Sequence, residues 1–154
     1  MEKKNSSNGR TISTNKKARH DYFIIDTFDC GLVLNGCEIK SIRNGDVNIT
    51  EGYCYVTSSG EVFIKNMYIK PYENGSFVEQ VPTRDRKLLL TKREIRKLKD
   101  FVKTKGNTIA PLSLFINEHG FAKLKIATVK GKHDYDRRED IKERDIRREM
   151  ERNM

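Results

Sequence analysis

No stretch of this sequence is apolar over the roughly 20 consecutive residues that a membrane-spanning helix requires. Residues 1–17 include lysine and arginine but lack the apolar segment of a secretory signal. These absences argue against a membrane protein and against an exported one. We therefore expect a cytoplasmic protein without a membrane partner.

Cysteine is scarce: Cys30, Cys37 and Cys54 are the three present, and no two are spaced as C-x-x-C. The histidines do not complete a zinc site with them at any standard spacing. A zinc site would therefore need other ligands, and reduced thiols that act as small core or strand residues explain the cysteines better. We expect no metal.

Motifs of the common enzyme classes are also missing. The sequence contains no P-loop, no G-x-G-x-x-G, no H-E-x-x-H and no G-x-S-x-G. His20 is chemically able to act as a general base, but it lies between Arg19 and Asp21 at the start of an expected strand, without an identifiable nucleophile. A structural or RNA-contacting histidine is the better interpretation. We expect no enzyme and no cofactor.

Positive charge is what the sequence has in excess. The formal net charge is +9 and the pI is about 9.5, which predicts an anionic partner. One short region is especially basic and contains Arg84, Arg86, Lys87, Lys92, Arg93, Arg96, Lys97, Lys99, Lys103 and Lys105. Such a face attracts a phosphate backbone through counterion release, although a solvated helix face is the alternative. Because the N-terminal segment is basic too, nucleic acid is favoured.

The composition divides the chain into three zones. Residues 1–14 are polar and without periodicity, which predicts a disordered basic arm. Residues 15–130 hold nearly all the apolar content and have the size of one domain. Residues 131–154 carry alternating charges and few apolar side chains, and they form a tail. Only the central body is expected to build a core.

Strand patterns dominate the body. Residues 22–28 are aromatic and β-branched, and the apolar run 32–34 ends at the turn pair Asn35-Gly36. We predict hairpins at residues 53–64 and 112–129. In the last strand an apolar face that starts at Ala122 alternates with a face that carries Lys123 and Lys125.

Helical patterns interrupt these strands. Thr91 and Glu94 form a capping box, and the helix that they begin is expected to end at Gly106, with its apolar residues on one side. A shorter helix is expected at 38–43. Many short strands with few helices predict a mainly β fold, namely a small antiparallel barrel with flanking short helices.

Several blocks of sequence are more specific than composition. They are N-K-K-A-R-H-D-Y-F-I at 15–24, G-L-V-L-N-G-C-E-I-K-S-I-R at 31–43, T-R-D-R-K-L-L-L at 83–90, A-K-L-K-I at 122–126 and K-G-K-H-D-Y-D-R-R at 130–138. In this order the blocks resemble the SsrA-binding protein family, also called small protein B. A structural ribosomal protein or an RNA chaperone is the rival interpretation, and composition alone does not separate the two.

The resemblance implies an oligonucleotide-binding (OB-like) barrel and a role in bacterial trans-translation. A member binds the tRNA-like domain of transfer-messenger RNA (tmRNA) and delivers it to the A site of stalled ribosomes, so that the nascent peptide is tagged for degradation. The implied partners are tmRNA, the ribosomal RNA of the decoding centre and mRNA channel, and, indirectly, elongation factor Tu with GTP. We expect a monomer.

The resemblance also implies which residues of the body contact RNA: Asn15, Arg19, Asp29, Leu89 and Lys123. Asparagine and arginine donate to phosphates and base edges, whereas an acidic side chain accepts from base amino groups or a 2′-OH. Asp29 stands where the family more often has glutamate. Leu89 either packs on an unstacked base or belongs to the core.

In the tail the resemblance implies a hinge and a ribosome-contacting segment. These comprise Lys130, Gly131, Lys132, Tyr135, Asp136, Arg137, Arg138 and Lys142. His133 departs from the family's G-K-K hinge. Opposite charges three and four residues apart support a helix only weakly. We therefore expect a tail that is disordered alone and helical in the mRNA channel, with Tyr135 stacking on a ribosomal base; a solvated tail without function is the alternative.

Overall fold

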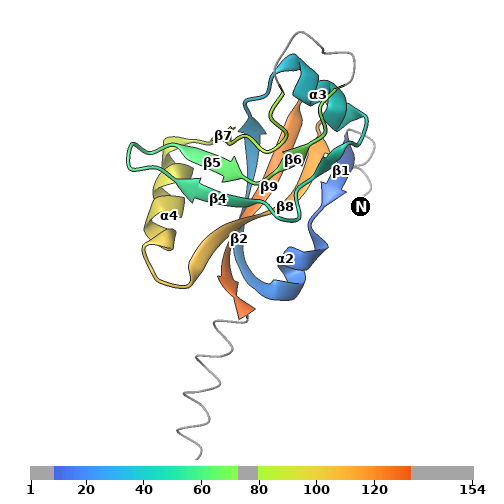
Figure 1. Ribbon diagram of the computed structural model, residues 1–154. Helices are drawn as coiled ribbons and strands as arrows, with labels where there is room; N and C mark the ends of the chain where they lie inside the picture. Colours follow the sequence, from blue (N-terminus) through green and yellow to red (C-terminus); the bar gives the residue numbers. More distant parts are fainter. Residues whose placement is uncertain (1–8, 73–79, 133–154) are drawn as a thin grey trace, which may run out of the picture.

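The computed structural model describes residues 9–72 and 80–132. In this part of the chain six antiparallel strands close into a ring, in the order β8-β4-β5-β7-β2-β9 (Figure 1). They are β2 (Tyr22–Leu32), β4 (Tyr53–Val56), β5 (Val62–Lys65), β7 (Arg86–Leu89), β8 (Asn107–Ile116) and β9 (Ala122–Gly131). The ring closes because β9 pairs with β2 on one side and with β8 on the other. A mainly β antiparallel fold with short helices is confirmed.

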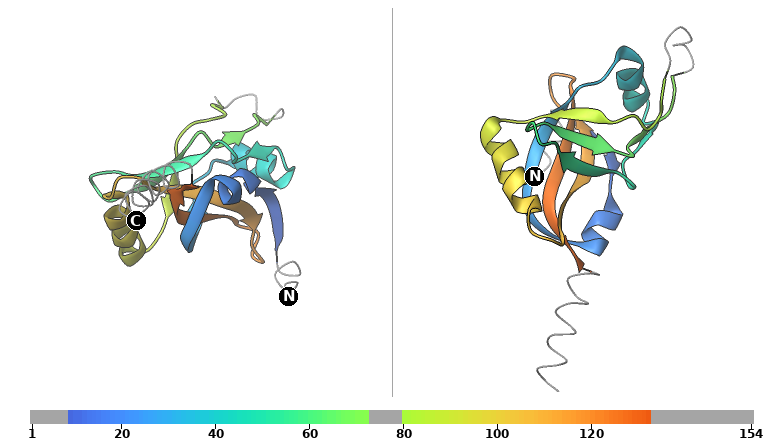
Figure 2. Two further views of the ribbon diagram at one scale, coloured as in Figure 1. Left: turned by 90° about the horizontal axis from the view of Figure 1, so that it is seen from below. Right: turned by 60° about the vertical axis from the view of Figure 1, so that its left-hand side comes forward.

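Short strands and helices surround the ring. Strand β1 (Arg10–Thr14) extends the sheet beyond β8, and β3 (Val47–Asn48) pairs with β6 (Tyr68–Ile69). The helices are α2 (Lys16–Asp21), α3 (Gly36–Arg43) and α4 (Lys92–Val102). Figures 1 and 2 show α3 and α2 toward opposite ends of the barrel and α4 along one side.

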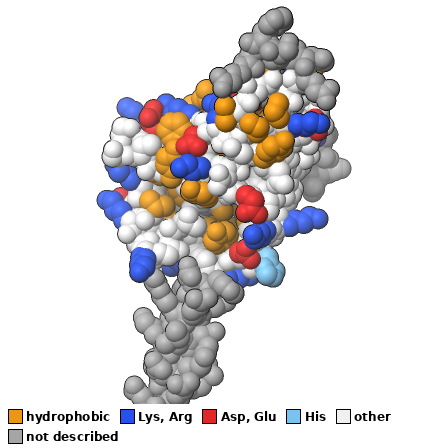
Figure 3. All heavy atoms as spheres, in the orientation of Figure 1, with side chains coloured by type: hydrophobic (Ala, Val, Ile, Leu, Met, Phe, Trp, Pro, Cys, Tyr) orange, Lys and Arg blue, Asp and Glu red, His pale blue; other side chains and the backbone are white. Residues whose placement is uncertain are grey.

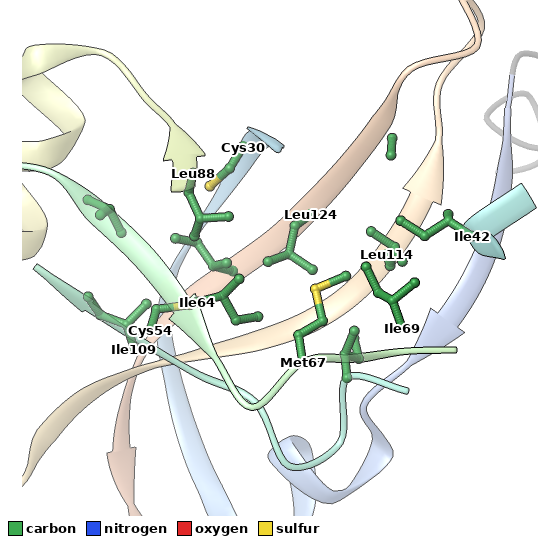
Figure 4. Packing of buried hydrophobic residues seen from close by; sticks show 14 of the residues in the cluster. Cys30, Ile42, Cys54, Ile64, Met67, Ile69, Leu88, Ile109, Leu114 and Leu124 are labelled. Carbon is green, nitrogen blue, oxygen red and sulfur yellow. The ribbon is translucent and has the colours of Figure 1, made fainter. Parts of the chain in front are cut away.

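The core fills the inside of the ring. Alternate side chains such as Cys30, Ile64, Leu88 and Leu124 come from different strands and point toward one another (Figure 4). Leu98 of α4 is also fully buried in this cluster. Each such side chain stabilises the fold by about 2 kcal/mol relative to an exposed one. Both predicted hairpins are confirmed, as β4–β5 and β8–β9.

Helix α4 begins as predicted and ends earlier. Thr91 and Glu94 form the expected capping box. The last helical residue is Val102, because the side-chain amide of Asn107 donates to the carbonyl of Phe101 at 3.0 Å and satisfies the helix end there. Gly106 has a φ of +91° and belongs to the turn that leads into β8. The predicted end at Gly106 was therefore wrong.

Two local patterns on either side of β2 were interpreted wrongly. Asn35 is the N-cap of α3 and shares a capping box with Glu38, so the Asn35-Gly36 pair begins a helix instead of making a strand turn. His20 lies in helix α2, which was not predicted, and not at the start of a strand. In both cases a capping asparagine marks the helix start.

Part of the segment that was predicted to be a disordered arm forms a strand. Residues 10–14 were expected to be disordered, but they form β1 and pair with β8. The Arg10 guanidinium also donates to the backbone carbonyl of Arg43 at 2.8 Å. Alternation in R-T-I-S-T is weak, and pairing with a neighbouring strand decides its structure. Residues 1–8 and the tail from residue 133 lie outside the described residues.

The cysteines are all free thiols. Cys30 and Cys54 are buried in the core, where burial raises the pKa of the Cys30 thiol to about 12, while Cys37 is half-buried in α3. Over residues 9–72 and 80–132 no cluster of three or more His, Cys, Asp or Glu side chains has an arrangement that could hold a metal ion. None of the helices described for these residues is both long enough and apolar enough to cross a bilayer.

Candidate nucleic-acid interface

Three of the predicted RNA-contacting residues lie on one outer face of the barrel. Gly31 of β2 is paired with Leu89 of β7 on one side and with Lys123 of β9 on the other. Directly paired residues point to the same side of a sheet, and the alternating neighbours Cys30, Leu88 and Leu124 point into the core. We call the surface formed by Asp29, Gly31, Leu89, Lys123 and Lys125 the β2–β9 face.

Leu89 is exposed, whereas the residue before it is buried. Its exposed fraction is 51%, against 1% for Leu88. The structure therefore decides between the two alternatives for Leu89, because this side chain does not belong to the core. An exposed leucine beside a lysine offers an apolar surface for a base and a positive charge for its phosphate.

Asp29 adds a carboxylate two residues before Gly31, on the same side of β2. It is paired in register with Lys125, and the Lys125 ammonium lies 3.0 Å from the Asp29 carboxylate. Both side chains are substantially exposed, so the pair contributes at most about 1 kcal/mol. Lys125 was not among the predicted contacts, although its alternation with Lys123 gave the signal.

Helix α2 lies on the same side of β9 and carries Arg19. Its Ala18 packs on Ala127 and Val129, which follow Lys125 at alternate positions of β9. Alternation alone would expose both residues, and the helix buries them. The side chain of Arg19 is exposed next to Ala18. The Arg19 carbonyl lies 3.4 Å from the Lys132 ammonium, so Arg19 is on the same outer side of β9 as the β2–β9 face but near the opposite end of that strand from Lys123.

Asn15 has a different position from the other predicted contacts. It is 4% exposed, its amide nitrogen donates to the carbonyl of Pro111 at 2.9 Å, and its side-chain oxygen accepts from the backbone N–H of Ala18 at 3.1 Å. Both polar groups are thus bonded within the chain. Asn15 caps α2 and attaches it to β8, so its contribution to an interface is to position Arg19.

A groove of about 390 Å³ continues the β2–β9 face toward α3 and the β8–β9 turn. It is lined by Gly31, Leu32, Leu34, Ile39, Arg43, Leu89, His119, Gly120, Phe121, Ala122 and Lys123. Phe121 is 65% exposed, and the Arg43 guanidinium donates to the carbonyl of Gly120 at 3.2 Å. An exposed aromatic ring beside cations suits base stacking. The sequence signal for Phe121 was its place on the lysine-bearing side of the last strand.

Part of the basic region at 84–105 is committed to the fold. Arg86 is fully buried, and Arg84 and Arg86 both donate to the Glu38 carboxylate, at 2.6–2.9 Å. Lys87 pairs with Glu61 at 2.9 Å. The prediction of an open basic face was therefore wrong for Arg86, whereas Arg84 and Lys87 are partly exposed and paired with carboxylates. The exposed cations of α4, which include Arg93 and Arg96, remain available.

The predicted hinge begins inside a strand. Lys130 and Gly131 are residues of β9 and pair with Phe23 and Tyr22. The Lys132 ammonium lies 5.3 Å from the centre of the Phe23 ring and 3.4 Å from the carbonyl of Arg19. The start of the tail is thus attached to α2 and β2. The predicted contacts Tyr135, Asp136, Arg137, Arg138 and Lys142 lie outside the described residues.

Comparison with known proteins gives one consistent result. The sequence model of the family described as SmpB protein matches residues 12–154. An SsrA-binding protein of Geobacillus thermodenitrificans is 53% identical over 144 residues, which cover 94% of this chain and 92% of that protein. An SsrA-binding protein of Streptococcus suis is 49% identical over 146 residues, with 95% and 93% covered.

A solved structure agrees with these sequence matches. It is described as "tmRNA-SmpB: a journey to the center of the bacterial ribosome", and one of its chains is similar to this one with a TM-score of 0.65 and 44% identity. The match covers 77% of this chain and 82% of that one. The chain therefore belongs to the SmpB family of SsrA-binding proteins, the non-enzymatic tmRNA-binding proteins of trans-translation.

Proposed function

We propose that the β2–β9 face binds the tRNA-like domain of tmRNA, and that the chain delivers this RNA to the A site of stalled ribosomes. The observation that carries the proposal is the gathering of Asp29, Leu89 and Lys123 on one outer face, with Arg19 of α2 on the same outer side toward the other end of β9. These residues are far apart in the sequence and have no shared structural task in the core. A common ligand explains their convergence.

Each side chain has a distinct part in this interface. Lys123 and Arg19 contact phosphates, and Asp29 accepts from a base amino group or a 2′-OH once its pair with Lys125 rearranges. Leu89 and Phe121 pack against unstacked bases at the groove. Asn15 acts indirectly, because it fixes the helix that carries Arg19. The barrel that supports them is of the OB type.

The tail has the second part of the role. Its predicted contacts from Tyr135 to Lys142 would enter the decoding centre and the mRNA channel, with the tail disordered in the free protein and helical on the ribosome. Support comes from the opposite charges that recur three and four residues apart in 139–147. Truncation after Gly131 is expected to abolish peptide tagging on stalled ribosomes and to leave binding of the tRNA-like domain intact. Full tagging by the truncated chain would contradict this role.

The remaining parts of the proposal follow from this role. Residues 10–130 would form the RNA-binding body, because β1 belongs to its sheet, with the basic N-terminal segment before it and the tail after it. The chain would act as a monomer in the cytoplasm, where ribosomes and elongation factor Tu with GTP are found; the GTP would be handled by that factor. Selective binding of tmRNA over bulk tRNA distinguishes this function from that of a general RNA chaperone.

The decisive test compares two lysines on opposite sides of the barrel. Lys123→Ala is expected to weaken binding of the tRNA-like domain by about tenfold, because a charge-assisted contact to phosphate is lost. Lys65→Ala removes the same charge from β5 and serves as the matched control. Affinity is measured by fluorescence anisotropy with labelled RNA, and the melting temperature is measured for each variant. Equal affinity losses in both variants, or a large fall in melting temperature with Lys123→Ala, would overturn the assignment.

A further inference from the structure

A second surface of the barrel carries aromatic side chains outside the β2–β9 face. Tyr53, Tyr55, Phe63 and Lys65 point outward from β4 and β5, because the alternating residues, such as Cys54 and Ile64, are buried in the core. In the antiparallel register Tyr53 is opposite Lys65, and Tyr55 is opposite Phe63. We call these four residues the tyrosine face.

Two of the three aromatic rings of this face stack on each other, and the third is exposed. The rings of Tyr55 and Phe63 are 5.7 Å apart at an angle of 19°, and the Lys65 ammonium lies 5.6 Å from the centre of the Tyr55 ring. Tyr53, at the end of the row, is 43% exposed. Figure 3 shows hydrophobic side chains gathered over β4 and β5 around Lys or Arg and Asp or Glu side chains. The exposed Tyr53 ring, with Lys65 opposite it, offers a surface on which a base could stack.

One hydrogen bond and one ion pair hold the tyrosine face in place. The Tyr55 hydroxyl donates to the Asp85 carboxylate at 2.5 Å, which links β4 to the segment before β7. Lys87, opposite Phe63 on β7, pairs with Glu61 at 2.9 Å. Because the rings of Tyr55 and Phe63 are already held, a ligand that binds this face does not have to order them.

The charges around the tyrosine face favour an anionic ligand. Within residues 9–72 and 80–132 Lys65 has no carboxylate partner. The Lys99 ammonium donates to the carbonyl of Ser58 at 3.4 Å, which holds α4, with its exposed cations, beside the β4–β5 turn. Aromatic side chains interleaved with lysines suit unpaired nucleotides, since each nucleotide offers a flat base and a phosphate.

The tyrosine face and the β2–β9 face are turned away from each other. In the ring order β8-β4-β5-β7-β2-β9, β4 is opposite β2 and β5 is opposite β9. An RNA held on the outer side of β2 and β9 therefore leaves the outer side of β4 and β5 open. Figure 1 shows β4 and β5 in front of the other two strands.

We propose that the tyrosine face binds unpaired nucleotides of ribosomal RNA, with a base stacked on Tyr53 and its phosphate at Lys65. The choice of ribosomal RNA rests on the proposed function, in which the other face is occupied by tmRNA when the chain enters the ribosome. The body would then contact RNA on two opposite sides, and ribosome binding would not depend on the tail alone.

The test uses the full chain, vacant 70S ribosomes and the tRNA-like domain of tmRNA. The variants are Tyr53→Ala with Lys65→Glu, and Tyr53→Phe as the control that keeps the ring. We expect the double variant to bind ribosomes about tenfold more weakly, because one stacked base and one phosphate contact are lost. Tyr53→Phe should bind ribosomes normally, and all variants should bind the tRNA-like domain with unchanged affinity. Ultraviolet crosslinking of the unchanged chain should join the Tyr53 peptide to ribosomal RNA.

Other outcomes would overturn the inference. They are ribosome affinity that does not change in the double variant, a crosslink from Tyr53 to a ribosomal protein, or a parallel loss of tmRNA binding. The melting temperature of each variant identifies a folding defect, and the crosslink decides the question if the double variant is unstable. If the proposed function itself is wrong, the experiment gives a different result, because the unchanged chain would then not bind the tRNA-like domain.

Discussion

The carboxylate of Glu38 holds two arginines in and next to the core, and its removal should be costly. Its side chain is 6% exposed, and that of Arg86 is 0% exposed. Glu38→Gln keeps the shape of the side chain but removes the charge, so the Arg86 guanidinium stays buried without its counterion. Breaking a buried pair from one side costs about 3–5 kcal/mol. We expect the lower end of this range, because the glutamine oxygen retains one acceptor.

Urea unfolding followed by far-ultraviolet circular dichroism measures this loss. The matched control is Glu61→Gln, which removes the same charge from the pair with Lys87, where both side chains are more than 40% exposed. An exposed pair contributes less than about 1 kcal/mol, so this variant should be nearly as stable as the unchanged chain. If Glu38→Gln costs no more than Glu61→Gln, the buried network does not have the energetic role assigned to it.

The same carboxylate gives a pH dependence with a definite sign. Burial alone would raise the pKa of Glu38, but hydrogen bonds from Arg84, Asn35 and Arg86 outweigh it and hold the pKa below its ordinary value of 4.5. The folded state therefore favours the ionised form. Its contribution is present above pH 4.5 and is lost as the pH falls through the lowered pKa. The stability difference between the unchanged chain and Glu38→Gln should narrow in acid, and a difference that stays constant would contradict this.

Two further variants test the candidate interface. Asn15→Ala should lower the free energy of unfolding by about 1–2 kcal/mol, because the N-cap of α2 is lost. It should also weaken binding of the tRNA-like domain, because Arg19 is no longer held in position. Urea unfolding measures the first effect and fluorescence anisotropy the second, and unchanged RNA affinity would exclude the positioning role of Asn15. Gly31→Ala would place a Cβ 3.3 Å from the Leu89 side chain, so Leu89 should shift and RNA affinity should fall. Its stability should change by less than about 1 kcal/mol, since Leu89 is exposed and free to move. Gly36→Ala, where a Cβ meets nothing within 4 Å, is the control, and equal RNA affinity in the two glycine variants would refute the effect.

Sequence patterns predicted the elements whose signals are local. The capping box at Thr91, the two hairpins and the inward side of β9 all depend on residues close together in the chain. The outward residues Ala127 and Val129 are buried by α2, a helix that is distant from them in the sequence. An alternation rule does not predict this burial. Likewise, R-T-I-S-T at 10–14 becomes a strand only because β8 offers it an edge.

Some residues of the candidate site could be predicted from local sequence, and others could not, because their positions depend on contacts with distant parts of the chain. The family resemblance named both Lys123 and Leu89, and alternation within one strand supported Lys123. Pairing between strands places Gly31 between these two residues. Net charge was misleading, because Arg86 is as basic as any exposed lysine and lies fully inside the fold. Asn15 shows the same limit, since a conspicuous polar residue in a motif is here a buried helix cap. Burial depends on distant partners, which local sequence does not specify.

The length of strand β9 sets the distance between Lys123 and the start of the tail. It carries Lys123 near its beginning and Gly131 at its end, and it is paired on both sides along the way. At about 3.3 Å per residue these two positions are about 26 Å apart. Insertion or deletion of one residue between them would turn one end to the wrong side of the sheet. The number of residues in β9, and not the identity of its side chains, therefore sets the separation between the proposed RNA-contacting lysine and the start of the tail.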